Sequence, residues 1–238
     1  MAWAAGVANR LNKRYLKTAL AAVLVSGLLA CGGGDDPPPV LTVDANGAST
    51  IDASALGTTL ATYPLSALST AEAASLAFMR EEEQLAHDVY VVSATLWQQN
   101  AFNNIAASET THSAAVKDLL DRYQQPDPLA GLPNGVFKSP AFQALYDSLV
   151  ATSRLSLVDA LKVAVEIEEL DIRDIVVQQA GIDNADILLV YDKLLRGSRN
   201  HLRAYMKLLI QQGGAYVPKY ISQAEFDAIA NSPTEKGG

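Results

Sequence analysis

A glutamate and a histidine stand one helical turn apart in Glu109-Thr110-Thr111-His112. Residues three apart on a helix share a face, so the carboxylate of Glu109 and the imidazole of His112 can reach one metal ion. Both fall on the apolar stripe of their segment. Taken alone, the pair also fits a simple hydrogen bond on a surface, so its interpretation depends on what the other segments place beside it.

A second histidine, His201, lies on an apolar stripe further along the chain, four residues before Tyr205. Ser198 occupies the place where a second Glu-x-x-His element would have its glutamate. The second half of a regular two-metal site is therefore incomplete. The alternative for His201 is a core histidine that hydrogen-bonds Tyr90, Tyr205 or a carboxylate.

Two further segments add carboxylates to apolar faces. In the first, one stripe selects Glu83 and also carries Tyr90, whereas a competing stripe selects Glu82. We prefer Glu83. His87 lies four residues after Glu83 and is within reach of the same site, but a partly exposed position suits it better.

The second acidic segment offers a choice among neighbours. Its cleanest stripe selects Glu168, and Glu169 and Asp171 remain as substitutes for the carboxylate missing at Ser198. Several buried and unpaired charges would cost several kcal/mol each, so a cation is the simplest explanation. Oxygen and imidazole ligands without thiolate suit iron, manganese or zinc, and we expect one or two ions of iron or manganese. The expected metal ligands are Glu83, Glu109, His112, Glu168 and His201.

Four long helices must position these residues. Apolar spacings of three and four predict helices over about 70–98, 103–124, 157–179 and 184–212. A long connection with a short helix over about 139–152 separates the second from the third, and a loop with a brief helix covers 216–229. We therefore predict an all-α fold, a ferritin-like up-down four-helix bundle with a long crossover between helices 2 and 3.

The N-terminus has the features of an export signal. A basic stretch ends at Lys17 and precedes a thirteen-residue apolar run, which is short for a membrane span of about 20 residues. The end of the run, Leu28-Leu29-Ala30-Cys31-Gly32, resembles the lipobox of bacterial lipoproteins. This resemblance implies lipid attachment at Cys31 and a location in the cell envelope, on the outer membrane facing the periplasm. An uncleaved anchor or a plain export signal is the alternative.

The composition after this signal predicts the domain organisation. Residues 1–30 are the expected signal peptide, and 31–68, rich in Gly, Pro, Ala and Thr, the expected flexible tether. A capping box of Ser69 and Glu72 begins a folded domain over 69–230. We expect a disordered tail over 231–238.

Charge and cysteine content exclude several classes. Four of the 18 Lys and Arg lie in the first 30 residues, where no Asp or Glu occurs, which leaves 14 against 26 acids in the rest. So acidic a body repels phosphate backbones, and nucleic acid is not an expected partner. One cysteine excludes an intrachain disulfide and any cysteine-rich metal site.

Four motifs together resemble the DUF2202 family, a ferritin-like group. They are Phe78-Met79-Arg80-Glu81-Glu82-Glu83-Gln84-Leu85-Ala86, Ser108-Glu109-Thr110-Thr111-His112, Ile167-Glu168-Glu169-Leu170-Asp171-Ile172 and Gly197-Ser198-Arg199-Asn200-His201-Leu202-Arg203-Ala204. The resemblance implies a ferritin-like fold and metal binding, without a settled reaction. Residues around Glu83 and Tyr90 are also similar to rubrerythrin. The missing glutamate at Ser198 argues against taking peroxidase or ferroxidase activity from the resemblance alone.

Two classes of function follow. The first is a lipid-anchored metalloprotein with peroxide-reducing or Fe²⁺-oxidising activity, which needs an electron donor that the sequence does not identify. The second is a non-enzymatic envelope scaffold or binding module with a metal-free bundle. Whether the chain is an enzyme, and whether it forms a homodimer, stays open.

Overall fold

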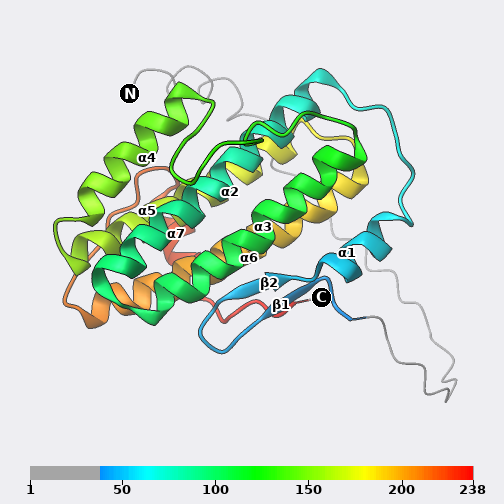
Figure 1. Cartoon of the computed structure of the whole chain (residues 1–238). Coiled ribbons are helices and arrows are strands. Elements are labelled where there is room, and N and C mark those ends of the chain that lie inside the picture. Colours follow the sequence, from blue (N-terminus) through cyan, green and yellow to red (C-terminus); the bar gives the residue numbers. More distant parts are fainter. Residues whose placement is uncertain (1–37, 238) are drawn as a thin grey trace, which may run out of the picture. The chain divides into compact units, whose positions relative to one another are not determined.

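The computed structural model describes residues 38–237. These residues form seven helices and one antiparallel sheet of two strands (Figure 1). The four longest helices are α2 (Thr70–Trp97), α3 (Asn100–Arg122), α5 (Leu157–Gln179) and α6 (Ala185–Gln211). The predominance of helix is confirmed, whereas the small sheet was not predicted.

The four long helices pack as two neighbouring pairs. α2 packs on α3 and α5 packs on α6, and the pairs meet through contacts of α2 with α5 and of α3 with α6. Gln98 ends α2 in the left-handed conformation with φ 52°, so the chain reverses at once and α3 begins at Asn100, three residues before the predicted start. The long connection after α3 contains α4 (Pro140–Ser153), which packs on α2 and α5.

Apolar side chains fill the space between the helices on both sides of their polar midsection. One cluster includes Tyr90, Phe102 and Tyr205, and the other includes Leu76 and Leu119. All five side chains are fully buried. Burial of this kind supplies about 25 cal/mol per Å² of apolar surface, which offsets the cost of polar groups enclosed between the two clusters.

The predicted tether is wrong over its described part. Residues from 38 onward form β1 (Leu41–Val43), β2 (Ser49–Ile51) and α1 (Ala53–Leu60), and the hairpin lies against α3 and α6 (Figure 1). Its turn is closed by the carboxylate of Asp44, which accepts from two backbone amides, and by Gly47 at φ 90°. Strands of three residues are too short to show an alternating pattern, so the sequence did not reveal them.

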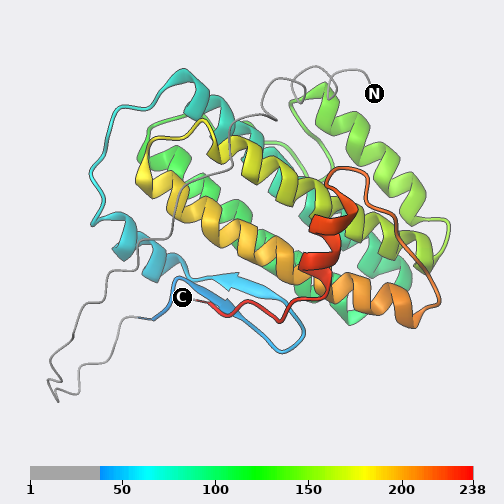
Figure 2. The ribbon, with the colours of Figure 1, turned by 180° about the vertical axis from the view of Figure 1, so that it is seen from behind.

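The C-terminal residues also pack on the helices. The short helix α7 (Gln223–Ala230) lies on α6 (Figure 2). Beyond it, the carboxylate of Glu235 accepts hydrogen bonds from Arg199 and Arg203 of α6. The expected disordered tail is therefore wrong over 231–237, because two guanidinium groups hold this segment in place.

The expected signal peptide and Cys31 lie outside the described residues. Within 38–237, no helix is both long and apolar enough to cross a membrane.

Candidate metal centre

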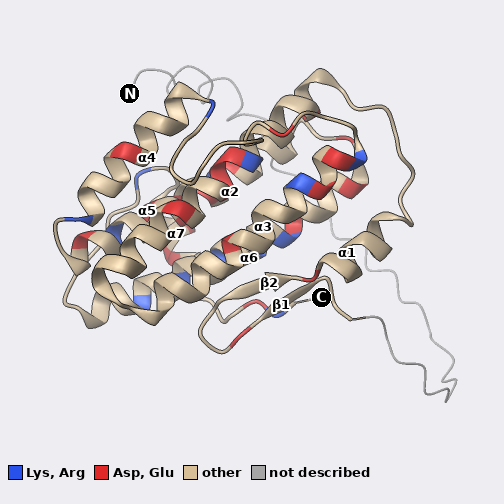
Figure 3. Cartoon of the chain, in the orientation of Figure 1, with Lys and Arg blue, Asp and Glu red and all other residues tan. Residues whose placement is uncertain are grey.

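The five predicted ligands come together at the centre of the four long helices. α2 supplies Glu83, α3 supplies Glu109 and His112, α5 supplies Glu168 and α6 supplies His201. Each of these residues is at most 2% exposed. The positions of Asp and Glu along the helices can be followed in Figure 3. The ligand atoms of Glu109, His112 and His201 lie within 4.8 Å of one another and can hold a metal ion.

The carboxylate of Glu109 lies between the two histidines. Its Oε2 is 2.9 Å from Nδ1 of His112, and its Oε1 is 2.9 Å from Nδ1 of His201. A second carboxylate approaches each histidine from another helix: Oε2 of Glu83 is 3.4 Å from Nδ1 of His112, and Oε1 of Glu168 is 3.5 Å from Nδ1 of His201. The site therefore has two similar halves that share Glu109.

Local sequence allows the two histidines to lie side by side. Their rings stack with centroids 5.4 Å apart. A Cβ at position 197 would stand 2.4 Å from Cε1 of His112, so only glycine lets α6 approach this ring so closely. The hydroxyl of Tyr90 on α2 donates to Oε1 of Glu168 on α5 at 2.6 Å and fixes that carboxylate.

Several polar atoms of the site have no hydrogen-bond partner, although they are inaccessible to solvent. They include Nδ1 of both His112 and His201 and Oε1 of Glu83. Each Nδ1 is close to a carboxylate oxygen but not in hydrogen-bonding geometry. Buried polar atoms are almost always paired, so unpaired atoms that converge on one space indicate a missing partner there.

The electrostatics around Glu109 differ from those of an isolated carboxylate. Burial alone would raise the pKa of Glu109, but the charges of His201 and His112 outweigh this effect and lower the pKa to well below its usual range. The same contacts act on the histidines in the opposite sense. Burial would lower the pKa of His201, but Glu109 and Glu168 raise it to about 9, and Glu109 and Glu83 raise the pKa of His112 well above its usual value.

The other two carboxylates hold protons more readily. Burial raises the pKa of Glu83 to about 7, although His112 opposes the rise. Burial likewise raises the pKa of Glu168 to about 6, against the pull of His201. Without a cation, the cluster therefore combines protonated histidines with carboxylates that are partly protonated near neutral pH.

Asp171, one of the two predicted substitutes, contacts the serine that stands where a second Glu-x-x-His element would have its glutamate. It follows Glu168 by one turn of α5, and the hydroxyl of Ser198 donates a hydrogen bond to its carboxylate. Its other oxygen is buried without a partner. Burial and the nearby charges of Glu83 and Glu168 raise the pKa of Asp171 well above its usual value.

Glu169, the other predicted substitute, is directed away from the site. Its carboxylate accepts from the backbone amides of Lys219, Tyr220 and Ile221 and from the hydroxyl of Tyr216. These four donors account for both oxygens. Glu169 therefore anchors the loop before α7 and does not contribute to the metal centre.

Glu82 and His87, the two remaining alternatives from the sequence, form no ion pair with the histidines of the site within residues 38–237. Glu82 is buried beside the site, where burial and the charges of Asp174 and Asp171 raise its pKa well above the usual value. None of the ion pairs shown for His112 and His201 in the described residues involves Glu82. His87 is partly exposed and lies 2.7 Å from Asp88, so it stays outside the cluster, as preferred from the sequence.

Ser49 is a site residue that the sequence did not reveal. Its Oγ lies 2.9 Å from Nε2 of His112 and 2.9 Å from Nε2 of His201. It belongs to β2, inside the segment predicted to be a tether. The only signal is an isolated serine in a stretch rich in Ser, Thr and Ala, which carries no information on its own.

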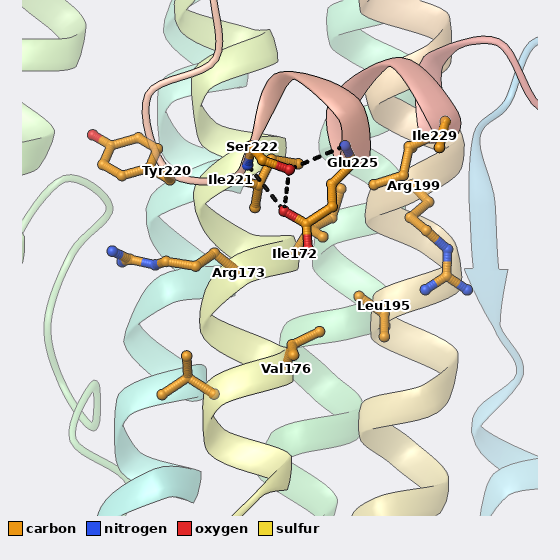
Figure 4. Close-up of a pocket in the computed structure, with 12 residues that line it drawn as sticks. Ile172, Arg173, Val176, Leu195, Arg199, Tyr220, Ile221, Ser222, Glu225 and Ile229 are labelled. Carbon is orange, nitrogen blue, oxygen red and sulfur yellow. Dashed lines mark hydrogen bonds between the residues drawn. The ribbon is translucent and has the colours of Figure 1, made fainter. Parts of the chain in front are cut away.

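A surface pocket of about 560 Å³ between α5, α6 and α7 is separate from this cluster (Figure 4). Its polar lining is already paired: Glu225 with Ser222 in a capping box, Arg199 with Glu235 and Arg173 with Asp174. None of the five ligands lines this pocket. The buried cluster is therefore the better candidate for function.

The comparisons with known proteins agree with the sequence motifs. Residues 72–233 match the family described as "Uncharacterized protein domain (DUF2202)". The "Uncharacterized protein MJ0754" of Methanocaldococcus jannaschii is 46% identical over 178 residues, which is 75% of this chain and 96% of the relative. The crystal structure of hypothetical protein MJ0754 from this archaeon superposes with a TM-score of 0.72 at 46% identity, over 73% of this chain and 99% of the other.

The matched range begins at α2, so it contains all five predicted ligands and Asp171 but not the hairpin with Ser49. With more than half of its length matched, the chain belongs to the DUF2202 family.

Proposed function

We propose that this chain is a ferritin-like, lipid-anchored metalloprotein whose four long helices hold two ions of iron or manganese. The observation that carries the proposal is the position of Glu109, whose two oxygens each face Nδ1 of a different histidine at 2.9 Å. A carboxylate that bridges two ions has this arrangement, and a Glu-x-x-His element is how ferritin-like bundles place it. The pairing of α2 with α3 and α5 with α6, joined by a long connection, supports the same fold.

The spacing of the donor atoms fits metal coordination. Neighbouring ligands of one ion at about 2.1 Å lie about 3 Å apart, which matches the contacts between Nδ1 atoms and carboxylate oxygens. Because the Nδ1 atoms lack hydrogen-bond partners, a metal ion would satisfy them together with Oε1 of Glu83. In a metal-free network, each Nδ1 has only its ion pairs with carboxylates, without hydrogen-bonding geometry.

The charge of the cluster favours two ions over one. Glu83, Glu109, Glu168 and Asp171 provide four carboxylates, and Glu83, Glu109 and Glu168 form ion pairs with the two histidines. Two divalent cations balance four negative charges, whereas one leaves two charges uncompensated in a poorly solvated core. Oxygen and imidazole donors without thiolate are consistent with iron or manganese.

Iron or manganese held here would supply redox chemistry: two ions that each give up one electron would provide the two electrons that reduce peroxide, and an external donor or Fe²⁺ would return them. The chain's own contribution is to orient Glu168 through Tyr90 and to exclude bulk water with the apolar clusters at both ends of the site. The hydroxyl of Tyr205 is buried nearby without a partner. It is available to donate a hydrogen bond to a small molecule that reaches the centre.

The proposed anchor rests on the sequence of residues 28–32. A lipid on Cys31 would hold the folded domain at the outer membrane, facing the periplasm. Each buried CH₂ contributes about 0.8 kcal/mol, so several acyl chains suffice to anchor an acidic protein without a membrane-spanning helix.

Elemental analysis of the purified 32–238 chain, made without a metal-binding affinity tag, tests the proposal. We expect about two iron or manganese ions per chain in the wild type. His112→Ala should weaken metal binding by about 100-fold or more, because the loss of an outer partner alone costs about 10- to 100-fold. His87→Ala is the matched control, since His87 lies outside the cluster, and should retain the wild-type content.

A wild-type protein that binds no stoichiometric metal, and whose melting temperature a chelator leaves unchanged, would support the metal-free scaffold instead. A content of one ion per chain would contradict the two-ion centre and would leave a single site formed by Glu109, His112 and His201.

A further inference from the structure

A residue of the hairpin closes the side of the metal centre opposite Glu109. Ser49 is fully buried, and its Oγ is equidistant from Nε2 of His112 and Nε2 of His201, at 2.9 Å from each. The two imidazoles are thus linked at their Nδ1 edge by Glu109 and at their Nε2 edge by Ser49. Both links join α3 to α6.

The positions of the protons determine which groups donate and which accept in these contacts. A serine hydroxyl has one proton to donate and two lone pairs that accept. If Nδ1 of each histidine binds a metal ion, the ring proton of each must be on Nε2, and both Nε2–H groups then need an acceptor. The two lone pairs of Ser49 provide one acceptor for each ring.

The hairpin is held so that this oxygen stays in place. The amide of Ser49 donates to Oγ of Ser108 at 2.9 Å, and the amide of Ile51 donates to Oγ1 of Thr111 at 3.0 Å. Both acceptors are on α3, within one turn of His112. Gly197 also contributes, because a Cβ there would stand 2.9 Å from Oγ of Ser49.

We propose that Ser49 is a positioning residue for the metal centre: its hydroxyl accepts from Nε2–H of both histidines and so directs both Nδ1 atoms at the ions. This inference rests on the proposed function. It also assigns a role to the hairpin, because a segment outside the four long helices then determines how well those helices bind metal. Docking of the hairpin and metal binding must favour each other to the same extent.

Titration of the metal-free 32–238 chain with Co²⁺ against a competing chelator tests the inference, with visible absorption as the readout. We expect Ser49→Ala to lower the Co²⁺ affinity about 10- to 100-fold, as the loss of an outer-shell partner does in other metal sites. Ser49→Thr retains the hydroxyl and suits a strand, so it should stay within a few-fold of the wild type.

Thr111→Val is the matched control for the hairpin itself. It removes the acceptor of the Ile51 amide but leaves the hydroxyl of Ser49 in place. We expect it to speed hydrogen exchange in the hairpin without changing the Co²⁺ affinity. A second readout is proton NMR of the Co²⁺-loaded protein, where the two Nε2–H groups give two shifted, exchangeable signals. In Ser49→Ala these signals should be lost through faster exchange with water.

The outcomes separate the two ideas. A wild type that binds no Co²⁺ overturns the proposed function and this inference together. A wild type that binds Co²⁺ with the same affinity as Ser49→Ala overturns only the role of Ser49. Equal losses in Ser49→Ala and Thr111→Val also overturn it, because the hairpin would then act only by covering the site.

Discussion

In our proposal, Asp171 on α5 replaces the glutamate that is missing from the motif on α6. On α6, Ser198 carries no carboxylate, but its hydroxyl donates to Asp171 and orients that carboxylate. In our proposal, Asp171 on α5, one turn beyond Glu168, supplies the ligand that α6 lacks. A Glu-x-x-Asp pair on α5 and a lone histidine on α6 then replace the usual distribution of ligands between two helices.

We expect Asp171→Asn to reduce the metal content from two ions to one per chain, because the remaining three carboxylates no longer balance two divalent cations. Elemental analysis measures this. Glu169→Gln is the matched control, since Glu169 accepts from the loop before α7 and should leave two ions bound. Two ions retained in Asp171→Asn would show that Asp171 is not a ligand.

The raised pKa values predict that metal binding depends on pH. In the metal-free protein, His201 has a pKa of about 9, Glu83 of about 7 and Glu168 of about 6. Each must lose its proton to bind a metal, so binding releases protons and the affinity rises as the pH increases from about 6 to about 9. Chelator competition at several pH values measures the slope. An affinity that stays constant over this interval would contradict the assignment of these residues as ligands.

At the scale of elements, the segments outside the four long helices are held by a few specific contacts. The hairpin is fastened to α3 by Ser108 and Thr111, and the loop before α7 is fastened to α5 by Glu169. The C-terminal segment is fastened to α6 by Glu235. The hairpin and α7 also bury apolar side chains, among them Leu41, Ile51 and Phe226, so the polar contacts add to apolar packing at these two attachments.

Glu235→Gln should release the C-terminal segment while the four long helices remain folded. Arg199 and Arg203 lower the pKa of Glu235 to about 2 despite its partial burial. The stabilisation is therefore present above the ordinary pKa near 4.5 and is lost as the pH falls toward 2. Faster hydrogen exchange over 231–237, with a loss of global stability of at most about 1 kcal/mol, is the expected result. Glu225→Gln, which weakens the start of α7 instead, is the control. Unchanged exchange in Glu235→Gln would contradict the attachment.

At the scale of the whole molecule, a polar centre lies between two apolar clusters inside the helices. Such a core is stable only if the charges at its middle are compensated. Protonated histidines do this in the metal-free protein, and in our proposal two metal ions take their place. The proposed lipid would fix this domain to a membrane without adding a spanning element.

Cys31→Ser should abolish lipid attachment and move the protein from the membrane fraction to the soluble one. Cys31 is the chain's only cysteine, so any thioether-linked lipid must be there. Incorporation of labelled palmitate measures the attachment. The same labelling in wild type and variant would exclude Cys31 as the modified residue.

The sequence by itself determined the long helices and the polar residues on their inward faces. Helix α5 was predicted at its observed bounds, and α2 and α6 to within one residue. Each is a long segment with apolar residues at helical spacing and with recognisable start and stop residues. Glu83, Glu109, His112, Glu168 and His201 were identified for the same reason. Helical periodicity specifies which side chains share an inward face, and a charged residue on an apolar face is conspicuous.

Only the tertiary structure decided between neighbouring acids and revealed the hairpin. Glu169 and Asp171 lie less than one helical turn apart on α5. Their roles differ because Glu169 contacts the loop before α7, whereas Asp171 contacts Ser198. Ser49 gains its importance from two histidines that are 63 and 152 residues away in sequence. Local patterns record which face a residue lies on, whereas its partners across the fold depend on how distant segments pack, and no local pattern contains that information.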